Sequence, residues 1–276
     1  MRIGVTGASG ALASAAVRLL AAAGHEVVAL TRTPGSCPAP DGVTVRRADF
    51  DEPAGLPAAF AGVDRLLLVS TDAWEPGRRI AQHTAAIDAA RDAGVRHLVY
   101  TSLVACDGPP DMLHRAHRAT EAHLRATAPR WTILRDAVYA EGIPGLLAGA
   151  RTTGRYVTNT GDGAVAYVRR DDCAATAAAA LVRTGDLHGR VLDVTGPRAL
   201  TAGDLAALAG PEVTAVHVSD DGYRAHLIAG GTPPPVADAL VELGRAIRSG
   251  RYATVTTTVP DLTGRPATEA GRPDGG

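Results

Sequence analysis

Three small residues near the amino terminus have the spacing of a loop that binds a nucleotide diphosphate. Gly7, Gly10 and Ala13 form a Gly-x-x-Gly-x-x-Ala pattern directly after the apolar run Arg2–Thr6. Gly7 permits a tight turn, Gly10 lets the backbone approach a phosphate, and Ala13 lets a helix lie close to the preceding strand. Backbone amides at the start of that helix would then face the phosphates. The pattern predicts a dinucleotide site, and a tight turn without a ligand is the alternative.

The end of the second expected strand predicts which dinucleotide binds. NAD requires an acidic side chain there for its ribose 2′-hydroxyl, whereas this chain has Thr31, Arg32 and Thr33. A guanidinium can pair with the 2′-phosphate of NADP and stack beside its adenine. We therefore expect NADP(H) as the cofactor, and a solvated loop arginine is the alternative.

Apolar runs of strand length alternate with helical periodicity through the first two-thirds of the chain. Strands are predicted over residues 2–6, 26–30, 43–48, 65–69, 97–102 and 131–134, and helices over 12–23, 54–61, 78–93 and 112–127. This alternation predicts an α/β fold with a doubly wound, Rossmann-like, mostly parallel sheet. Ligands of such sheets bind beyond the carboxyl ends of the strands, where the glycine-rich turn and Arg32 would both lie.

The regular alternation ends near residue 135. Beyond it, helices are predicted over residues 143–151, 171–184, 202–209, 220–229 and 236–249, and strands over 191–194 and 213–218. We expect an NADP-binding Rossmann core over residues 1–135, an interleaved substrate-binding α/β subdomain over 136–259, and a disordered tail over 260–276. Disorder is predicted for the tail because its polar, Gly and Pro residues leave little apolar area to bury.

The composition excludes several classes of protein. All 28 basic residues are arginines, so no lysine is available for a P-loop, a Schiff base or a Tyr-x-x-x-Lys pair. A net charge of −1 does not favour nucleic acid as a partner, and no apolar run predicts a membrane span. Cys37, Cys106 and Cys173 are too far apart to indicate a disulfide framework or a metal site. We expect a cytoplasmic protein with a small-molecule partner, and the oligomeric state stays open.

Several longer blocks carry a family resemblance. They are TGASGALA (6–13), LTRTP (30–34), ADFDEP (48–53), DRLLLVS (64–70), AGVRHLVYTSL (93–103), WTILRDAVYAE (131–141), GDGAVAYVRRDDCA (161–174), VLDVTGPRALT (191–201) and LTGRP (262–266). In their order and spacing the chain resembles the NmrA-like branch of the atypical short-chain dehydrogenases/reductases, and within it the NADPH-dependent quinone oxidoreductase type. The resemblance implies an oxidoreductase that transfers hydride from NADPH to a quinone or a quinone-like aromatic carbonyl.

The resemblance also assigns residues to the parts of the cofactor. The assigned residues are Gly7, Ala8, Ser9, Gly10, Ala11 and Leu12 at the pyrophosphate, Arg32 at the 2′-phosphate, Asp49 and Phe50 at the adenine, Val69, Ser70 and Thr71 under the ribose, and Thr101 near the nicotinamide.

One departure from the family pattern bears on the chemistry. Most short-chain dehydrogenases carry a tyrosine and, four residues later, a lysine after the fifth strand, but these positions fall at Leu113 and His117. Quinone reduction tolerates this loss, because its phenolate-like product needs no strong acid, whereas an isolated ketone gives a basic alkoxide. Two alternatives stay open: a ketoreductase that tailors an aromatic polyketide, and a non-catalytic NADP(H)-sensing regulatory protein.

Three side chains near the expected nicotinamide are candidates for catalysis. Ser102 ends the fifth strand and could hydrogen-bond a substrate carbonyl. His117 and Glu121 are spaced i, i+4, so they could pair at the site; an ordinary polar helix face is the alternative. Tyr139 follows the sixth strand and could contact a flat substrate or simply lie at the edge of the core. No metal is expected, although His114 shares the face of His117 and Glu121.

Overall fold

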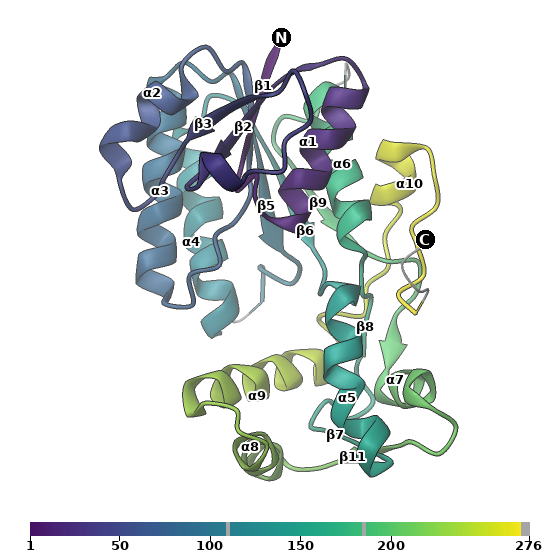
Figure 1. Ribbon diagram of the computed structural model, residues 1–276. Helices are drawn as coiled ribbons and strands as arrows, with labels where there is room; N and C mark the ends of the chain where they lie inside the picture. The colour runs from purple at the N-terminus through teal and green to yellow at the C-terminus, as the bar shows by residue number, and fades with distance from the viewer. Residues whose placement is uncertain (109–110, 184–185, 272–276) are drawn as a thin grey trace.

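A seven-stranded sheet forms the centre of the larger part of the molecule (Figure 1). The computed structural model describes residues 1–108, 111–183 and 186–271, apart from the side chain of Leu113. The strands lie in the order β3-β2-β1-β4-β5-β6-β9, and all neighbouring pairs are parallel. Their bounds are β1 Arg2–Thr6, β2 Glu26–Thr31, β3 Thr44–Arg47, β4 Arg65–Leu68, β5 His97–Leu103, β6 Trp131–Asp136 and β9 Arg190–Val194. The predicted doubly wound α/β sheet is confirmed.

Helices cover both faces of this sheet, as its almost continuously apolar strands require (Figure 1). One layer consists of α1 (Ala11–Ala22) and α6 (Arg170–Val182), and the other of α2 (Leu56–Phe60), α3 (Pro76–Asp92) and α4 (Met112–Thr127). Alternate strand residues pack into two apolar clusters, one under each layer. The absence of a side chain at Gly4 permits this packing, because a Cβ there would lie 2.8 Å from Cδ1 of Leu66.

A smaller unit, which we call the lower lobe, lies beyond the carboxyl ends of the strands (Figure 1). It is formed by α5 (Ile143–Thr153), β7 (Arg155–Thr158), α7 (Ala202–Ala209), β11 (Thr214–His217), α8 (Asp220–Ala229) and α9 (Pro234–Arg248). The chain enters the lobe after β6, returns to the sheet for α6 and β9, and then enters the lobe again. The parallel pair β7–β11 joins the two passes, as does the antiparallel pair β8 (Ala164–Val165) with β10 (Leu200–Thr201). The two parts are therefore interleaved in sequence.

Most predicted elements occur within a few residues of their predicted bounds. The predictions for α4, α7 and α8 match in full, whereas β7, β8, β10 and the short helices η1 (Pro34–Ser36), η2 (Pro53–Gly55) and η3 (Ala140–Gly142) were not predicted. The predicted end of the helix over 171–184 falls at residue 184, which lies outside the described residues. Within the described part of the chain, no helix combines the length and apolar character needed to cross a membrane.

The prediction of disorder over residues 260–276 is wrong for the part that the structure describes. Here α10 (Thr258–Thr263) packs against α6, and Asp172 of α6 binds the residues that follow. The fully buried Asp172 carboxylate lies 2.6 Å from the Arg265 guanidinium and accepts the backbone N–H of Thr268 at 2.7 Å. A buried charge requires such partners, and they hold this polar segment in place. Residues 272–276 lie outside the described residues.

Candidate functional site

The glycine-rich turn between β1 and α1 has the geometry of an anion site. Gly7 has a φ of +65°, which side chains rarely adopt, and its carbonyl accepts the N–H of Gly10 at 2.8 Å. A Cβ on Gly10 would lie 3.2 Å from that carbonyl oxygen. Helix α1 begins at Ala11 with no side-chain cap and no acidic residue in its first turn. Its first amides and the positive end of its dipole therefore suit a diphosphate.

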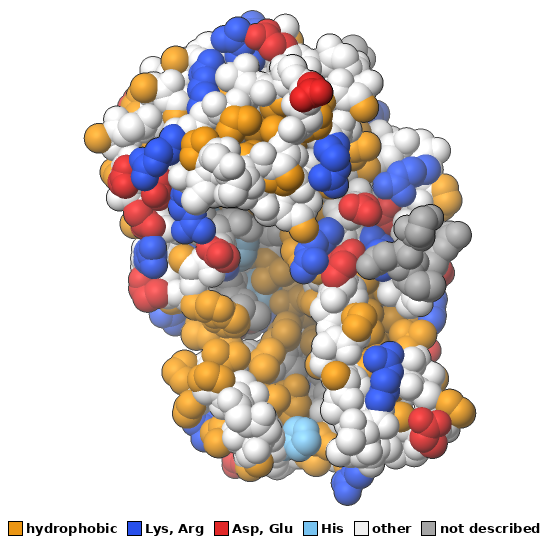
Figure 2. Space-filling model, viewed as in Figure 1, with side chains coloured by type: hydrophobic (Ala, Val, Ile, Leu, Met, Phe, Trp, Pro, Cys, Tyr) orange, Lys and Arg blue, Asp and Glu red, His pale blue; other side chains and the backbone are white. Residues whose placement is uncertain are grey.

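A cavity of about 530 Å³ opens beside this turn, at the carboxyl ends of the first four strands. That volume falls within the range of roughly 300–1,000 Å³ that is usual for ligand sites. Most of the predicted cofactor residues line it, namely Gly7, Ser9, Gly10, Arg32, Asp49, Phe50, Val69, Ser70 and Thr71. We call it the cofactor cavity. Figure 2 shows that the molecule is also hollowed between the sheet and the lower lobe, with apolar side chains along the hollow.

Three predicted pyrophosphate residues lie outside the lining of the cofactor cavity. The side chain of Ala8 is buried and its N–H donates to the carbonyl of Leu30 at 3.1 Å, so neither group is available to a phosphate. The Leu12 side chain belongs to the apolar core, which leaves its backbone amide as the group that could face a phosphate. Ala11 is exposed as the first residue of α1.

Three buried side chains hold the backbone of residues 69–71, which lines the cofactor cavity. Thr101 was predicted to approach the nicotinamide, but it is buried and is absent from the cavity lining. Its role is to position the segment after β4, together with Thr6 and His83. Thr6 Oγ1 accepts the N–H of Val69, Thr101 Oγ1 that of Ser70, and His83 Nε2 that of Thr71, each at 2.9 Å.

Arg32 lies at the carboxyl end of β2, where the sequence places the 2′-phosphate. Its exposed side chain makes no hydrogen bond or ion pair with any residue that the structure describes, so its donors are available. Beneath it, the hydroxyls of Ser9 and Thr31 lie 2.7 Å apart and tie the phosphate turn to β2. The geometry therefore places a guanidinium at the end of the cavity that should hold the adenosine half.

Gln82 of α3 also lines the cofactor cavity, although it was not predicted to do so. Its Nε2 donates to Asp51 at 2.9 Å, and Arg78 binds the same carboxylate at 2.7 Å. These two hydrogen bonds, Arg78 first, lower the pKa of Asp51 to about 2. Because a carboxylate only accepts, Gln82 must turn its oxygen away from Asp51, and this Oε1 is buried without a partner among the described residues. Nothing in the sequence around Gln82 distinguishes it from an ordinary helix residue, so its place in the cavity lining could not be predicted.

Ser102 and Glu121 belong to a buried network on the α4 side of the sheet. The Ser102 hydroxyl donates to Glu121 at 2.6 Å, and Arg135 of β6 binds the same carboxylate at 2.8 Å. Burial opposes the ionisation of Glu121, but hydrogen bonds from Arg135 and Ser102 outweigh it and lower its pKa. The pairing of His117 with Glu121, which the i, i+4 spacing allowed as one of two alternatives, is not formed in the structure. It fails because Arg135, which is distant in sequence, is a stronger partner for the carboxylate.

His117 instead bonds to Tyr100, whose hydroxyl lies 2.9 Å from its Nδ1. Burial and, after it, the charge of Arg79 hold the pKa of His117 well below its usual value, so the imidazole is neutral. His114 turns to the carboxylate of Asp111 at 2.7 Å. These histidines thus have separate partners, and the described residues contain no cluster of metal-ligating side chains.

Tyr139 follows β6 and closes over the buried Asp136. Its hydroxyl donates to Asp136 Oδ2 at 2.9 Å, and the other carboxylate oxygen is buried without a partner among the described residues. Burial raises the pKa of Asp136 to about 7, and the Tyr139 hydrogen bond only partly offsets it. Arg170 lies over the Tyr139 ring at 5.2 Å. The Tyr139 hydroxyl is therefore engaged inside the protein and not directed at a substrate.

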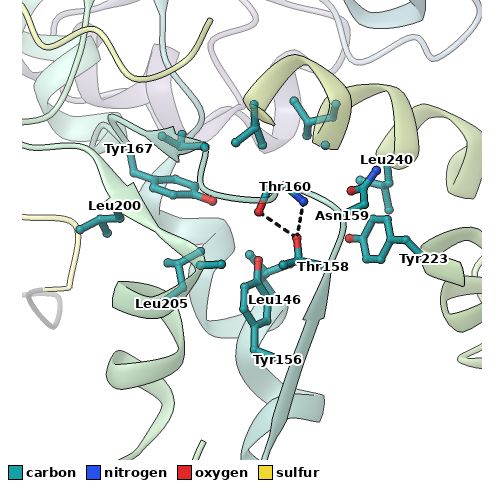
Figure 3. Close-up of a pocket in the computed structure, with 16 residues that line it drawn as sticks. Leu146, Tyr156, Thr158, Asn159, Thr160, Tyr167, Leu200, Leu205, Tyr223 and Leu240 are labelled. Atoms are coloured by element: carbon teal, nitrogen blue, oxygen red, sulfur yellow. Dashed lines mark hydrogen bonds between the residues drawn. The ribbon is translucent and has the colours of Figure 1, made fainter. Parts of the chain in front are cut away.

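A second, smaller cavity lies inside the lower lobe (Figure 3). Its volume is about 70 Å³, and Tyr156, Tyr167 and Tyr223 line it together with leucines. The hydroxyls of Thr158 and Thr160 lie 3.2 Å apart at its edge. A cavity that binds benzene has about 150 Å³, so this one is too small for a quinone ring.

Known proteins similar to this chain share its fold and cofactor chemistry. The family described as NAD(P)H-binding matches residues 7–184. Quinone oxidoreductase 2 of Escherichia coli is 34% identical over 274 residues, covering 96% of this chain and 95% of that protein. The (4-alkanoyl-5-oxo-2,5-dihydrofuran-3-yl)methyl phosphate reductase of Streptomyces griseus is 36% identical over 270 residues, covering 95% and 93%.

A solved structure extends this likeness to three dimensions. The crystal structure of the E. coli NADPH-dependent quinone oxidoreductase in complex with NADPH has a TM-score of 0.91 with this chain. The two are 33% identical, and the match covers 98% of this chain and 97% of that one. An NmrA-like family domain-containing oxidoreductase of Aspergillus flavus is 30% identical over 238 residues, covering 81% of this chain and 76% of that protein. The predicted family and the predicted pyridine dinucleotide are thereby confirmed. The chain belongs to the NAD(P)H-binding, NmrA-like family of atypical short-chain dehydrogenases/reductases and is an NAD(P)H-dependent oxidoreductase.

Proposed function

We propose that the protein transfers hydride from NADPH to a quinone or a quinone-like aromatic carbonyl, without a Tyr/Lys catalytic pair. The observation that carries the proposal is the cofactor cavity of about 530 Å³, with the unpaired Arg32 at one end. The E. coli relative is named as a quinone oxidoreductase, and its structure contains NADPH, which supports both the acceptor and the cofactor. NADPH, when bound, supplies the hydride; the chain binds it, orients it and limits the access of water.

Each part of the chain has its own task in this proposal. Residues 1–135 hold the cofactor, with the α1 amides at the diphosphate, Arg32 at the 2′-phosphate, and Asp49 and Phe50 beside the adenine. The lower-lobe segments of residues 136–259 close the hollow over the nicotinamide end and shape the substrate site. The three free cysteines suit a reducing compartment, so we place the protein in the cytoplasm.

The hydrogen bonds of the predicted catalytic residues favour a quinone over an isolated ketone. Ser102 donates to Glu121, Tyr139 donates to Asp136, and His117 is bound to Tyr100. None of these groups is a strong acid aimed at the cofactor cavity. A quinone accepts hydride to give a phenolate-like anion whose proton can come from water, whereas a ketone would require a positioned acid.

The S. griseus relative widens the substrate class. Its named substrate is a dihydrofuranone that carries an alkanoyl group and a methyl phosphate. Such a compound is a conjugated carbonyl without being a quinone. The shared requirement is an acceptor in which the charge left by the hydride is delocalised.

Two measurements on the purified protein test the proposal. Calorimetry should show NADPH binding more tightly than NADH, and oxidation of NADPH should follow the addition of naphthoquinones or benzoquinones. Turnover of cyclic ketones but not quinones would establish the ketoreductase alternative. Tight NADP binding without turnover of either class would establish the regulatory alternative, and the absence of binding to either coenzyme would overturn the proposal.

A further inference from the structure

Arg79, near the start of α3, is an arginine without a hydrogen-bond or ion-pair partner among the described residues. Its side chain is half-buried, yet it makes no hydrogen bond or ion pair with any described residue, and its Nε is fully enclosed. The neighbouring Arg78, by contrast, binds Asp51 through two nitrogens. Partial burial of an unpaired guanidinium is unfavourable, because its donors lose water and gain no acceptor. Such a group indicates a site that an oxygen-rich ligand completes.

The position of Arg79 relates this group to the proposed substrate site. Helix α3 begins after the segment that lines the cofactor cavity, whose last lining residue before the helix is Asp72. The starts of α3 and α4 lie at the carboxyl edge of the sheet and face α9 of the lower lobe (Figure 1), across the hollow that Figure 2 shows. Asp72 acts electrostatically on Arg79 but forms no ion pair with it. Arg79 also interacts electrostatically with Tyr100 of β5 and with His117 of α4.

His117 of α4 is a second polar side chain here, and the charge of Arg79 acts on it. The tautomers follow from the hydrogen bonds. His83 Nε2 accepts the N–H of Thr71, so His83 carries its proton on Nδ1, 2.9 Å from Thr120 Oγ1, and Thr120 in turn donates to a backbone carbonyl. The hydroxyl of Tyr100 is then available to donate to His117 Nδ1 at 2.9 Å. With Tyr100 as the donor, the proton of neutral His117 lies on Nε2, which has no acceptor among the described residues.

We propose that Arg79 and His117 bind an acidic substituent, a carboxylate or a phosphate, on the conjugated carbonyl substrate. The pair combines a forked cation with a neutral N–H donor, which suits the several oxygens of such an anion. The inference rests on the proposed function, because it names a subsite of the same substrate. It narrows the substrate class to carbonyl acceptors that carry a negative charge.

Two naphthoquinones that differ by one charge test this subsite. We would measure the binding of 1,4-naphthoquinone and 1,4-naphthoquinone-2-sulfonate to the NADP-loaded protein by calorimetry, and then kcat/KM for both with NADPH. In Arg79→Met, binding and kcat/KM for the sulfonate should fall by roughly tenfold to a hundredfold, because a charge-assisted interaction is lost. The values for the neutral quinone should stay within about twofold. For each quinone, we compare kcat/KM of the variant with kcat/KM of the wild type. This ratio does not depend on the different chemical reactivity of the two quinones.

Matched variants separate a local effect from a general one. Arg91→Met removes an exposed arginine from the far end of the same helix and should leave both quinones unchanged. His117→Asn, like Arg79→Met, should lower the affinity and kcat/KM for the sulfonate relative to the wild type. Arg79→Lys should retain part of the activity that Arg79→Met loses with the sulfonate. The melting temperature of each variant shows that its fold is intact.

Other results would overturn either the Arg79 subsite or the proposed quinone reduction. Equal losses for both quinones in Arg79→Met, or no loss for either, would overturn the subsite. A loss of NADPH affinity with unchanged discrimination between the quinones would assign Arg79 to a cofactor phosphate and would also overturn it. Arg79-dependent sulfonate binding without any NADPH oxidation would retain the subsite and refute the proposed quinone reduction instead.

Discussion

Arg32 is the side chain on which the choice between NADPH and NADH should depend. It lies exposed at the end of β2, beside the phosphate turn, with no protein partner among the described residues. We predict that Arg32→Ser raises the Kd of NADPH by roughly tenfold to a hundredfold, because charge-assisted hydrogen bonds contribute about 1.5–3 kcal/mol. The Kd of NADH should change little. Titration calorimetry with both coenzymes measures the ratio of the two dissociation constants.

A control for Arg32 is Arg18→Ser, which removes an exposed arginine from α1 outside the cavity lining. It should leave both dissociation constants unchanged. An equal loss of NADH and NADPH affinity in Arg32→Ser would mean that Arg32 supports the cavity without reading the 2′-phosphate.

Ala105 shows how one residue can store strain next to the site. It follows β5 with a φ of +64°, and no other described non-glycine residue has a positive φ. Left-handed backbone costs an alanine about 1–2 kcal/mol, and the extra freedom of glycine in the unfolded chain offsets about 0.5–1 kcal/mol of this. We therefore predict that Ala105→Gly stabilises the protein by about 0.5–1 kcal/mol. Urea unfolding measures this change. Ala85→Gly, within α3, should instead lower the free energy of unfolding by about 1 kcal/mol.

At the scale of elements, Asp172 explains why α10 and the segment after it are ordered. This carboxylate on α6 is the buried partner of Arg265 and Thr268. We predict that Asp172→Ala lowers the free energy of unfolding by about 3 kcal/mol, because the Arg265 guanidinium and the Thr268 N–H lose their buried acceptor. Hydrogen exchange over residues 258–271 should accelerate first. The adjacent Asp171 is exposed, so Asp171→Ala should change exchange there very little.

Sequence periodicity was sufficient for the elements that have a strong apolar pattern. Helix α4 was predicted in full, because its apolar residues repeat at helical spacing between clear ends. By contrast, β8 and β10 are two residues long and exist only because they pair with each other. Helix α10 is short and polar, and it depends on α6, to which no local pattern points.

In the candidate site, too, features that depend on local sequence were predictable and contacts between distant segments were not. Gly7 and Gly10 form the tight turn that their spacing predicts and line the cofactor cavity, because backbone geometry there depends on the glycines themselves. Pairings between distant segments were not predictable. The i, i+4 spacing of His117 and Glu121 was real, but Arg135 and Tyr100 decided which way each side chain turned.

For the molecule as a whole, Asp136 should leave a signature in the pH dependence of stability. Its folded pKa of about 7 exceeds the unfolded value. Below about pH 4 the carboxyl is protonated in both states, and between about pH 4 and 7 only the unfolded chain ionises, so the folded state loses relative stability as pH rises. The penalty is constant above about pH 7. We predict that Asp136→Asn removes it.

The measurement is the difference in unfolding free energy between Asp136→Asn and the wild type. This difference should be small at pH 4 and rise to a plateau above about pH 7, where it is on the order of 4 kcal/mol in favour of the variant. Taking the difference cancels the opposite contributions of His83 and His97, whose pKa values burial lowers to about 3 and about 4. A difference that does not vary with pH would show that burial leaves the pKa of Asp136 at its unfolded value.

The double passage of the chain through the lower lobe has a consequence for biosynthesis. During synthesis β1 to β6 are made first, and none of the pairings among them needs a segment after residue 136. β7 can pair with β11 only after β11 has been synthesised, and Asp172 gains its partners only when Arg265 and Thr268 have left the ribosome. The nascent polypeptide therefore contains the strands that border the cofactor cavity well before the lower lobe can be completed.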